Sequence, residues 1–200
     1  MDFVILGLSG KALAGKSTAH DAAKKIIAEH PELSSYKVRY MPLAEKLKEI
    51  CTDLFDWDGD KGIYYHEDGS IVQDKGRQLL INVGTDKMRA IRPTVWVDYV
   101  VKKITKLIKD PETHKTIFII DDIRFKNEMA VMNKFGKKFM SVRISRKSQL
   151  NLDTESEKDL DDFTDFDYHL DNNGTIEDLE GLMKQIMEDL LTRSKGRVHV

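Results

Sequence analysis

Apolar residues follow two alternating patterns along this chain: short continuous runs, and longer stretches with an apolar residue at every third or fourth position. The continuous runs are typical of buried strands and lie at 3–8, 37–41, 116–120 and 138–144. The helical spacing occurs at 16–28, 44–55, 76–88, 97–108 and 127–135. Strands that alternate with helices predict a mostly parallel sheet with helices on both faces, which is a three-layer α/β fold.

Two polar stretches interrupt this alternation. Residues 56–73 contain two clusters of turn-forming residues and are expected to form a surface excursion with a short hairpin. Residues 146–162 are predicted to form a mobile lid, although a plain surface loop would have the same polar composition. A short edge strand is expected at 165–170, and Thr175 is expected to cap a closing amphipathic helix.

The composition narrows the class of protein. Hydrophobic residues make up 40% of the chain and charged residues 33%, which fits one globular domain over 1–200. With 32 basic and 34 acidic residues the net charge is −2, so no overall field attracts nucleic acid and any anion site must be built locally. The single cysteine, Cys51, excludes a disulfide within the chain. No apolar run is long enough to span a membrane and no basic leader precedes the first strand, so a cytoplasmic location is expected.

The clearest chemical signal is the sequence Gly-Lys-Ala-Leu-Ala-Gly-Lys-Ser at 10–17, which has the G-x-x-x-x-G-K-S pattern of a phosphate-binding loop. Its glycines allow a tight turn whose N–H groups converge on a polyphosphate, Lys16 supplies charge to the β- and γ-phosphates, and the Ser17 hydroxyl ligates Mg²⁺. The residues predicted to bind the nucleotide cofactor are Gly10, Lys11, Ala14, Gly15, Lys16, Ser17 and Thr18. A glycine-rich turn without a ligand is the alternative, and the predicted strand before the loop and helix after it argue against that alternative.

A second anchor for a nucleotide site is an acidic residue at the end of an apolar strand, and the strand at 116–120 is followed by both Asp121 and Asp122. Successive side chains of a strand point to opposite faces, so only one of the two can face the phosphates. Arg124 lies two residues beyond Asp122, where its guanidinium could hold an incoming phosphate by two hydrogen bonds. An ion pair that closes the strand end would produce the same triplet.

Further cations recur near the predicted end of the sheet, namely Lys48, Arg89, Arg92, Arg143 and Arg146. A phosphoryl-transfer enzyme needs positive charge on both the donor and the acceptor phosphates, because alignment and charge do most of the catalysis. Taken singly, each of these residues could equally be a solvated surface charge. The six histidines show no metal-ligand spacing.

Five motifs occur in order along the chain. After the phosphate loop come Ala44–Glu49, similar to A-D-P-L-K-E; Gly84–Arg89 followed by Trp96, similar to G-T-[DE]-x-x-R with a later Trp; Asp122–Glu128, similar to D-x-R-F-x-N-E; and Ser156–Tyr168, similar to a lid with a D-F-D-[YW] ending. Together they resemble the phage-type deoxynucleoside monophosphate kinase family, which shares its pattern with animal phosphomevalonate kinases. Two departures are Lys46, where the family usually has Pro, and Thr154, where many members have His.

This resemblance implies a P-loop kinase fold, ATP with Mg²⁺ as donor, and transfer of the γ-phosphoryl group to a deoxynucleoside monophosphate. Ser17 and Asp122 would hold the metal. The residues that it assigns to the acceptor are Lys48, Arg89, Trp96 and Arg124. The residues that it assigns to catalysis are Lys16, Asp122, Arg124, Arg143 and Arg146, the last two closing over the transferred group with the lid. The partners implied are small molecules and, by analogy with related enzymes, a second copy of the chain in a homodimer.

Two other functions remain open from the sequence. A small-molecule kinase of the phosphomevalonate type would share the lid and the D-F-D-[YW] ending. A nucleotide-dependent switch or assembly protein would use the phosphate loop without an acceptor site, so it would not need Lys48, Arg89 and Arg124.

Overall fold

The computed structural model describes residues 2–59, 63–65, 71–73, 75–110, 115–147 and 154–195. Its main sheet contains the strands β1 (Phe3–Ser9), β2 (Lys37–Tyr40), β5 (Thr116–Ile123), β6 (Phe139–Ser145) and β7 (Tyr168–Asp171) in the order β2-β5-β1-β6-β7. Every neighbouring pair is parallel. The carboxyl ends of all these strands therefore meet at one edge of the sheet, with β1 at the centre, where α/β proteins bind their ligands.

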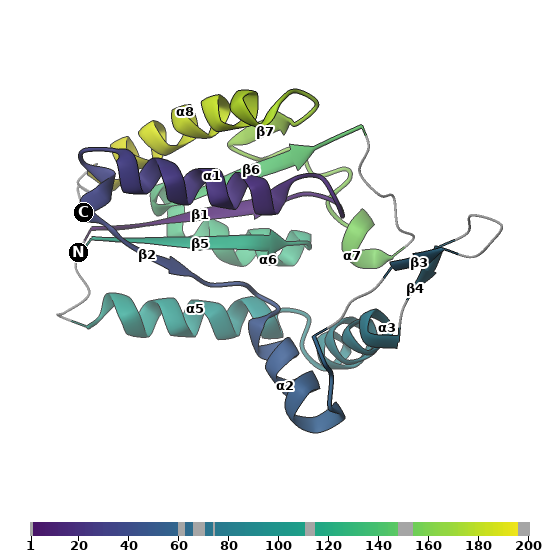
Figure 1. The fold of residues 1–200 in the computed structure, drawn as a ribbon. Coiled ribbons are helices and arrows are strands. Elements are labelled where there is room, and N and C mark those ends of the chain that lie inside the picture. The colour runs from purple at the N-terminus through teal and green to yellow at the C-terminus, as the bar shows by residue number, and fades with distance from the viewer. Residues whose placement is uncertain are drawn as a thin grey trace.

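Helices cover both faces of the sheet (Figure 1). The helices α1 (Lys16–Glu29) and α8 (Ile176–Lys195) pack against one face, and α2 (Glu45–Phe55), α5 (Val95–Ile108) and α6 (Lys126–Met132) pack against the other. The strand alternation of β5 serves both layers, because Ile117 and Ile119 join the core under α1 and α8 while Phe118 and Ile120 join the core over α2 and α5. The predicted three-layer α/β fold is confirmed.

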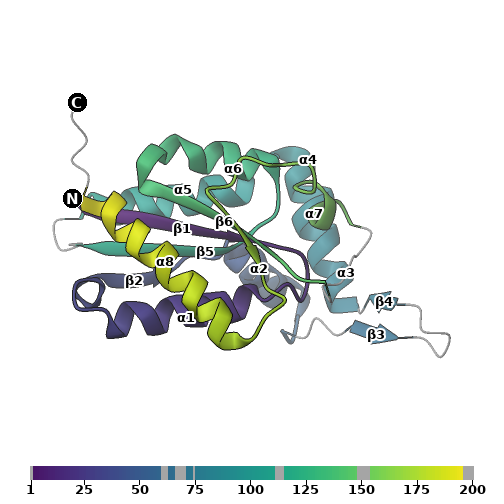
Figure 2. The same cartoon turned by 90° about the horizontal axis from the view of Figure 1, so that it is seen from above.

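Most of the chain outside these layers lies near the carboxyl edge, but 33–35 and 133–138 directly precede β2 and β6 and so lie at the opposite edge. The remaining elements are η1 (Leu33–Ser35), β3 (Ile63–Tyr65), β4 (Ile71–Gln73), α3 (Lys75–Ile81), η2 (Asn82–Met88), α4 (Arg89–Ile91), η3 (Asn133–Lys138) and α7 (Glu155–Lys158). The strands β3 and β4 pair antiparallel, so the expected excursion carries a hairpin, and this hairpin projects beyond α3 (Figure 2). The predicted edge strand is β7, and Thr175 accepts a hydrogen bond from the Asp178 N–H (3.2 Å) at the start of α8.

Two helices differ from their predicted form. The helix expected over 76–88 is α-helical only to Ile81 and continues as the π-helix η2, a rare form that is frequent at functional sites. The helix expected over 127–135 gives way at Asn133 to the 3₁₀ segment η3, which is broken at Gly136 with φ +55°. Helical periodicity in a sequence hardly distinguishes these variants, so tertiary contacts decide between them. In the described part of the chain, no helix combines the length and apolar character that a membrane span requires.

Candidate active site

The phosphate loop connects β1 to α1 at the centre of the carboxyl edge. Gly15 adopts φ +102°, a left-handed conformation that glycine permits, and begins α1. Gly10 is equally constrained, since a Cβ there would lie 2.6 Å from the Ile144 carbonyl oxygen of β6. Among the described residues, no side chain caps the N-terminus of α1 and its first turn carries no acid. The first N–H groups of α1 and its dipole are therefore available to an anion.

Lys16 lies folded over this loop. Its Nζ donates hydrogen bonds to the carbonyl oxygens of Gly10 and Lys11, each at 2.7 Å. Burial, with a smaller contribution from the nearby Arg124 guanidinium, lowers the pKa of Lys16 to about 8. An anion on the loop would offset this desolvation, so the ammonium group is suited to bind phosphate.

A cavity of about 370 Å³ opens beside the loop. Residues predicted for cofactor, metal, acceptor and catalysis meet in its lining, namely Lys16, Ser17, Lys48, Arg89, Trp96, Asp122 and Arg124. They come from α1, α2, α4, α5, β5 and the segment that directly follows β5, so only the folded chain brings them together. The size lies within the range of small-molecule sites.

The two aspartates at the end of β5 point to opposite faces of the sheet. Asp122 accepts the Leu43 N–H (2.8 Å) and the Ala44 N–H (2.9 Å), which ties its carboxylate to the start of α2. Burial raises the pKa of Asp122 against the effect of these hydrogen bonds. Asp121 lies on the face of β5 that α1 covers, as strand alternation requires. Of the two carboxylates, Asp121 is therefore on the side of Lys16 and Ser17.

Asp121 also has side-chain partners. The Tyr40 hydroxyl donates to its Oδ1 at 2.7 Å, and Nδ1 of His20 lies 3.7 Å from its Oδ2. Burial alone would raise the pKa of Asp121, but the contacts with His20 and Tyr40 outweigh it and lower that pKa. Asp121 is thereby kept as an ionised, oriented acceptor.

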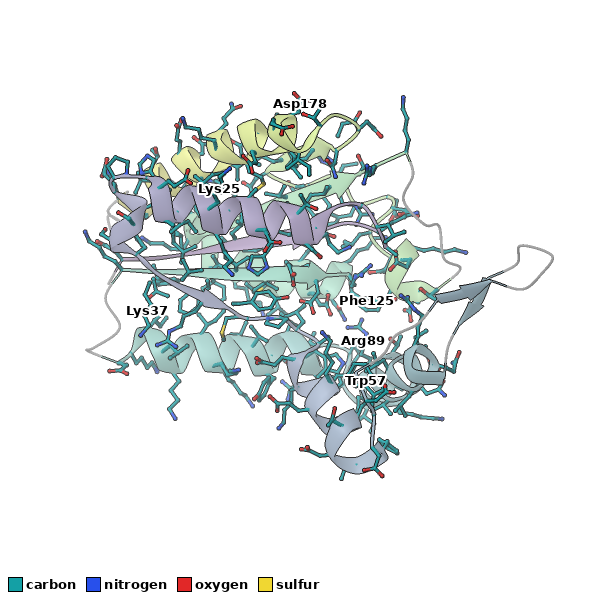
Figure 3. All side chains as sticks on the ribbon, in the orientation of Figure 1. Lys25, Lys37, Trp57, Arg89, Phe125 and Asp178 are labelled. Carbon is teal, nitrogen blue, oxygen red and sulfur yellow. The ribbon has the colours of Figure 1, made fainter. Side chains whose placement is uncertain are left out.

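Arg89 and Phe125 lie beside each other (Figure 3). The Arg89 guanidinium group is held from three sides. It lies 3.4 Å from the centre of the Phe125 ring, and its nitrogens lie 3.3 Å from Glu128 Oε1 and 3.3 Å from Asn127 Oδ1. Glu128 also accepts the N–H groups of Arg124 (2.9 Å) and Phe125 (3.1 Å) at the start of α6. Burial raises the pKa of Glu128 to about 7. The D-x-R-F-x-N-E motif therefore fixes the orientation of Arg89, which comes from a different helix, α4.

The described part of the predicted lid, 154–162, contacts the phosphate loop through carboxylates. Glu157 accepts the Ala12 N–H (2.8 Å) with one oxygen and pairs with Arg124 (2.5 Å) through the other. Asp161 pairs with Lys11 (2.8 Å) and Arg143 (3.3 Å). The carboxylates of 154–162 thus form ion pairs with the same cations that are predicted to bind phosphate. Residues 148–153 of the predicted lid lie outside the described residues.

Three other predicted residues have different surroundings. Arg143 donates to the Ser9 hydroxyl (2.9 Å) and lies outside the cavity lining, and burial lowers its pKa. Arg146 is exposed after the end of β6 and also lies outside that lining. The indole N–H of Trp96 donates to the Gly84 carbonyl (3.1 Å), so this side chain supports η2 at the cavity wall.

Sequence reasoning assigned no role to several residues at this site, among them His20, Tyr40, Glu128, Glu157 and Asn172. Glu128 and Glu157 belong to two of the five sequence motifs, so their membership in those motifs was a signal that could have identified them. For His20 and Tyr40 there was none. The proximity of Tyr40 to Asp121 depends on the pairing of β2 with β5, and that of His20 depends on the packing of α1 against the sheet.

The structure also bears on a metal. Within the described residues no group of three His, Cys, Asp or Glu side chains is arranged to hold an ion. Mg²⁺ typically takes one or two protein oxygens and completes its shell with water and substrate phosphates. The hydroxyl of Ser17 and the carboxylate of Asp121 or Asp122 line the same cavity and fit that donor set.

Residues 69–183, more than half of the chain, match the family model described as deoxynucleotide monophosphate kinase. None of the curated proteins compared matches the chain. The matched region includes Arg89 and the residues that hold it, as well as Arg124 and Glu157, and it begins after the phosphate loop.

Proposed function

The chain belongs to the deoxynucleotide monophosphate kinase family, and we propose that it transfers the γ-phosphoryl group of ATP to a deoxynucleoside monophosphate, giving ADP and the deoxynucleoside diphosphate. One observation carries this proposal. The phosphate loop and three further cations, Lys48, Arg89 and Arg124, line one cavity. A nucleotide switch has no use for this second set of charges, whereas a kinase needs it for the acceptor phosphate.

The donor side is built from the loop. The main-chain N–H groups at the start of α1 would surround the β-phosphate, and Lys16 would move from the Gly10 and Lys11 carbonyls to the β- and γ-phosphates. Mg²⁺, held by Ser17 and by Asp121 directly or through water, would neutralise charge on these phosphates. Asp122 would act mainly by holding the start of α2 beside the acceptor.

The acceptor side is built from side chains. Arg89 and Arg124 would bind the acceptor phosphate as bidentate donors, and Lys48 would add a point charge. In the described part of the chain the Lys48 side chain has no ion-pair or hydrogen-bond partner, which leaves its ammonium group available to an anion. A phosphate oxygen of the acceptor then attacks the γ-phosphorus, and the bond from that phosphorus to the bridging oxygen of ADP breaks. The attacking oxygen is already ionised at neutral pH, so no general base is required.

Water must be excluded while the γ-phosphate is activated. We propose that 146–162 serves as a lid in this step, with Arg143 and Arg146 reaching the phosphates when it closes. Asp161, which pairs with Arg143 in this structure, would release it to the nucleotide.

The test is an assay of purified protein with ATP, Mg²⁺ and a panel of acceptors that contains the four common deoxynucleoside monophosphates, their ribose counterparts and phosphomevalonate. We expect ADP release together with a deoxynucleoside diphosphate. Transfer to phosphomevalonate alone would move the chain to the small-molecule kinases. ATP binding without transfer to any acceptor would favour the switch.

A further inference from the structure

The turn between β7 and α8 reaches the phosphate loop through Asn172. This residue is only 9% exposed, and its side-chain Nδ2 donates a hydrogen bond to the Ala14 carbonyl oxygen at 2.9 Å. Its own main-chain N–H donates to the Ser145 carbonyl at the end of β6 (2.8 Å). The amide is therefore anchored to the sheet and cannot follow the loop if the loop moves.

The same amide packs against the left-handed turn of the loop. A Cβ at Gly15 would lie 2.1 Å from Asn172 Nδ2, so the amide occupies the space that any other residue at 15 would need. Gly15 has φ +102°, a conformation with several alternatives open to glycine. The side chain of Asn172 thus limits the conformations of the most permissive residue of the loop.

The hydrogen bond also sets the direction of one main-chain donor. A peptide group is planar and trans, so its C=O and N–H point in opposite directions. Holding the Ala14 carbonyl toward Asn172 therefore turns the Gly15 N–H away from Asn172. In the G-x-x-x-x-G-K-S pattern the main-chain N–H groups of the loop are the phosphate ligands, so this orientation would matter for binding. A freely rotating Ala14–Gly15 peptide would have to be ordered by the ligand, at a cost in affinity.

We propose that Asn172 is a positioning residue for the donor phosphates, acting through the Ala14–Gly15 peptide of the phosphate loop. This inference rests on the proposed use of the loop for ATP and not on the identity of the acceptor. The proposal assigns a role to the Asn-Asn-Gly turn at 172–174. This turn is far from the loop in sequence, since 158 positions separate Asn172 from Ala14.

A structural role alone is the rival explanation, because any buried hydrogen bond adds stability. The chain contains a matched control at the opposite end of α8, where the Tyr36 hydroxyl shares a buried hydrogen bond of 2.8 Å with Ser194. The substitution Tyr36→Phe removes that hydrogen bond without approaching the loop.

The experiment compares Asn172→Ala, Asn172→Asp and Tyr36→Phe with the unmodified chain. Calorimetry gives the Kd for ATP with Mg²⁺, steady-state kinetics give KM for ATP and for the acceptor separately, and thermal melting reports stability. We expect Asn172→Ala to raise the Kd and KM for ATP about tenfold, the order of one well-oriented hydrogen-bond donor, with acceptor KM within about twofold. Tyr36→Phe is expected to lower the melting temperature and leave both constants unchanged.

The Asp variant sharpens the test because it has nearly the same size and lacks the amide donor. Its ionised carboxylate would repel the Ala14 carbonyl oxygen, whereas its protonated form can donate to that oxygen again. We expect Asn172→Asp to bind ATP more weakly than Asn172→Ala near neutral pH, and the gap between the two variants to narrow as the pH is lowered. A gap that stays constant with pH would overturn the proposed hydrogen-bond mechanism.

Two further outcomes would overturn the proposal: unchanged ATP affinity in both Asn172 variants despite lower melting temperatures, or equal losses of donor and acceptor affinity. If neither variant folds, Asn172→Ser carries the test. Its polar side chain is one bond too short to donate to the Ala14 carbonyl from the same backbone position, so unchanged ATP affinity in it counts against the proposal. A failure of the proposed function is distinguishable, since it would show as an unmodified chain that does not bind ATP, or that binds ATP and phosphorylates no deoxynucleoside monophosphate.

Discussion

The two halves of the cavity, proposed above as the donor side and the acceptor side, carry positive charge by different means. On the donor side the charge is carried mainly by main-chain N–H groups of 10–17 and the dipole of α1, with Lys16 as the principal side chain. On the acceptor side the charge is carried by Lys48, Arg89 and Arg124, which come from three separate elements. A main-chain site is oriented by the course of the chain. A side-chain site must be oriented by neighbours, and Phe125, Asn127 and Glu128 do so for Arg89.

The largest effect is expected from removing the one donor-side charge that the main chain cannot replace. Lys16→Ala should lower kcat by about 10²–10³-fold, because its ammonium group stabilises charge on the transferred phosphoryl group. The melting temperature should not fall, since the ammonium group is desolvated and has no ion-pair partner among the described residues. Lys24→Ala, exposed on the same helix, is the control. Near-normal turnover in the Lys16 variant would contradict the proposed role of the phosphate loop in phosphoryl transfer.

Substitutions of the two aspartates of β5 test whether Asp121 serves catalysis while Asp122, on the other face of the sheet, serves stability. Asp121→Asn should lower kcat by about 10- to 100-fold, as expected of a group that orients a metal or its water. Asp122→Asn should chiefly lower stability, by about 1 kcal/mol, because an amide cannot accept both N–H groups at the start of α2. Kinetics and urea unfolding of both variants decide this. The reverse pattern would return the metal to Asp122, as the resemblance first implied.

Arg89 tests the acceptor side. Arg89→Ala should raise the acceptor KM about tenfold or more while the KM for ATP stays within about twofold, since a bidentate charged contact to phosphate is lost. Arg89→Lys should rescue little, because an ammonium group cannot reproduce the stacked, planar contact with Phe125. Arg92→Ala serves as the matched control, since Arg92 is close in sequence, more exposed and paired with Asp98. A rise in the KM for ATP alone would mean that Arg89 binds the donor, so the assignments of the two halves of the cavity would have to be exchanged.

The smallest kinetic effect is expected at Glu128, which holds Arg89, and the effect of Glu128 on stability depends on pH. The pKa of Glu128 is raised to about 7 in the folded chain, above its value when unfolded. Its contribution to stability is therefore present at low pH and is lost as the pH rises to about 7, by an amount on the order of 3 kcal/mol. Relative to Glu128→Gln, the unmodified chain should lose stability between pH 5 and pH 8 in urea unfolding. A difference that does not change over this range would contradict the raised pKa.

The same substitution has a kinetic counterpart. Ionised Glu128 attracts the Arg89 guanidinium, and protonated Glu128 does not. As the pH falls through about 7, the acceptor KM should therefore rise a few-fold more in the unmodified chain than in Glu128→Gln, because protonation of the acceptor phosphate itself affects both proteins equally.

The elements that were predicted well are those with a complete local pattern. The apolar runs at 3–8 and 116–120 correspond to β1 and β5, and the spacing at 16–28 corresponds to α1. Where the local pattern is compatible with several backbone forms, the prediction was less complete. The helix expected over 76–88 changes to a π-helix at Asn82, where the Trp96 indole takes the Gly84 carbonyl as its hydrogen-bond acceptor.

For the site, the sequence by itself determined the phosphate loop, because glycine spacing, Lys16 and Ser17 lie within one continuous segment whose geometry follows from the local backbone. It also determined that Asp121 and Asp122 face opposite ways, since strand alternation is a local property. Only the tertiary structure decided which of them lies beside α1, how Arg89 is held, and that Asn172 reaches the loop. These relations join residues far apart in the chain. They depend on strand order and packing, which bring distant segments together through the burial of apolar surface as a whole and leave no local pattern of their own.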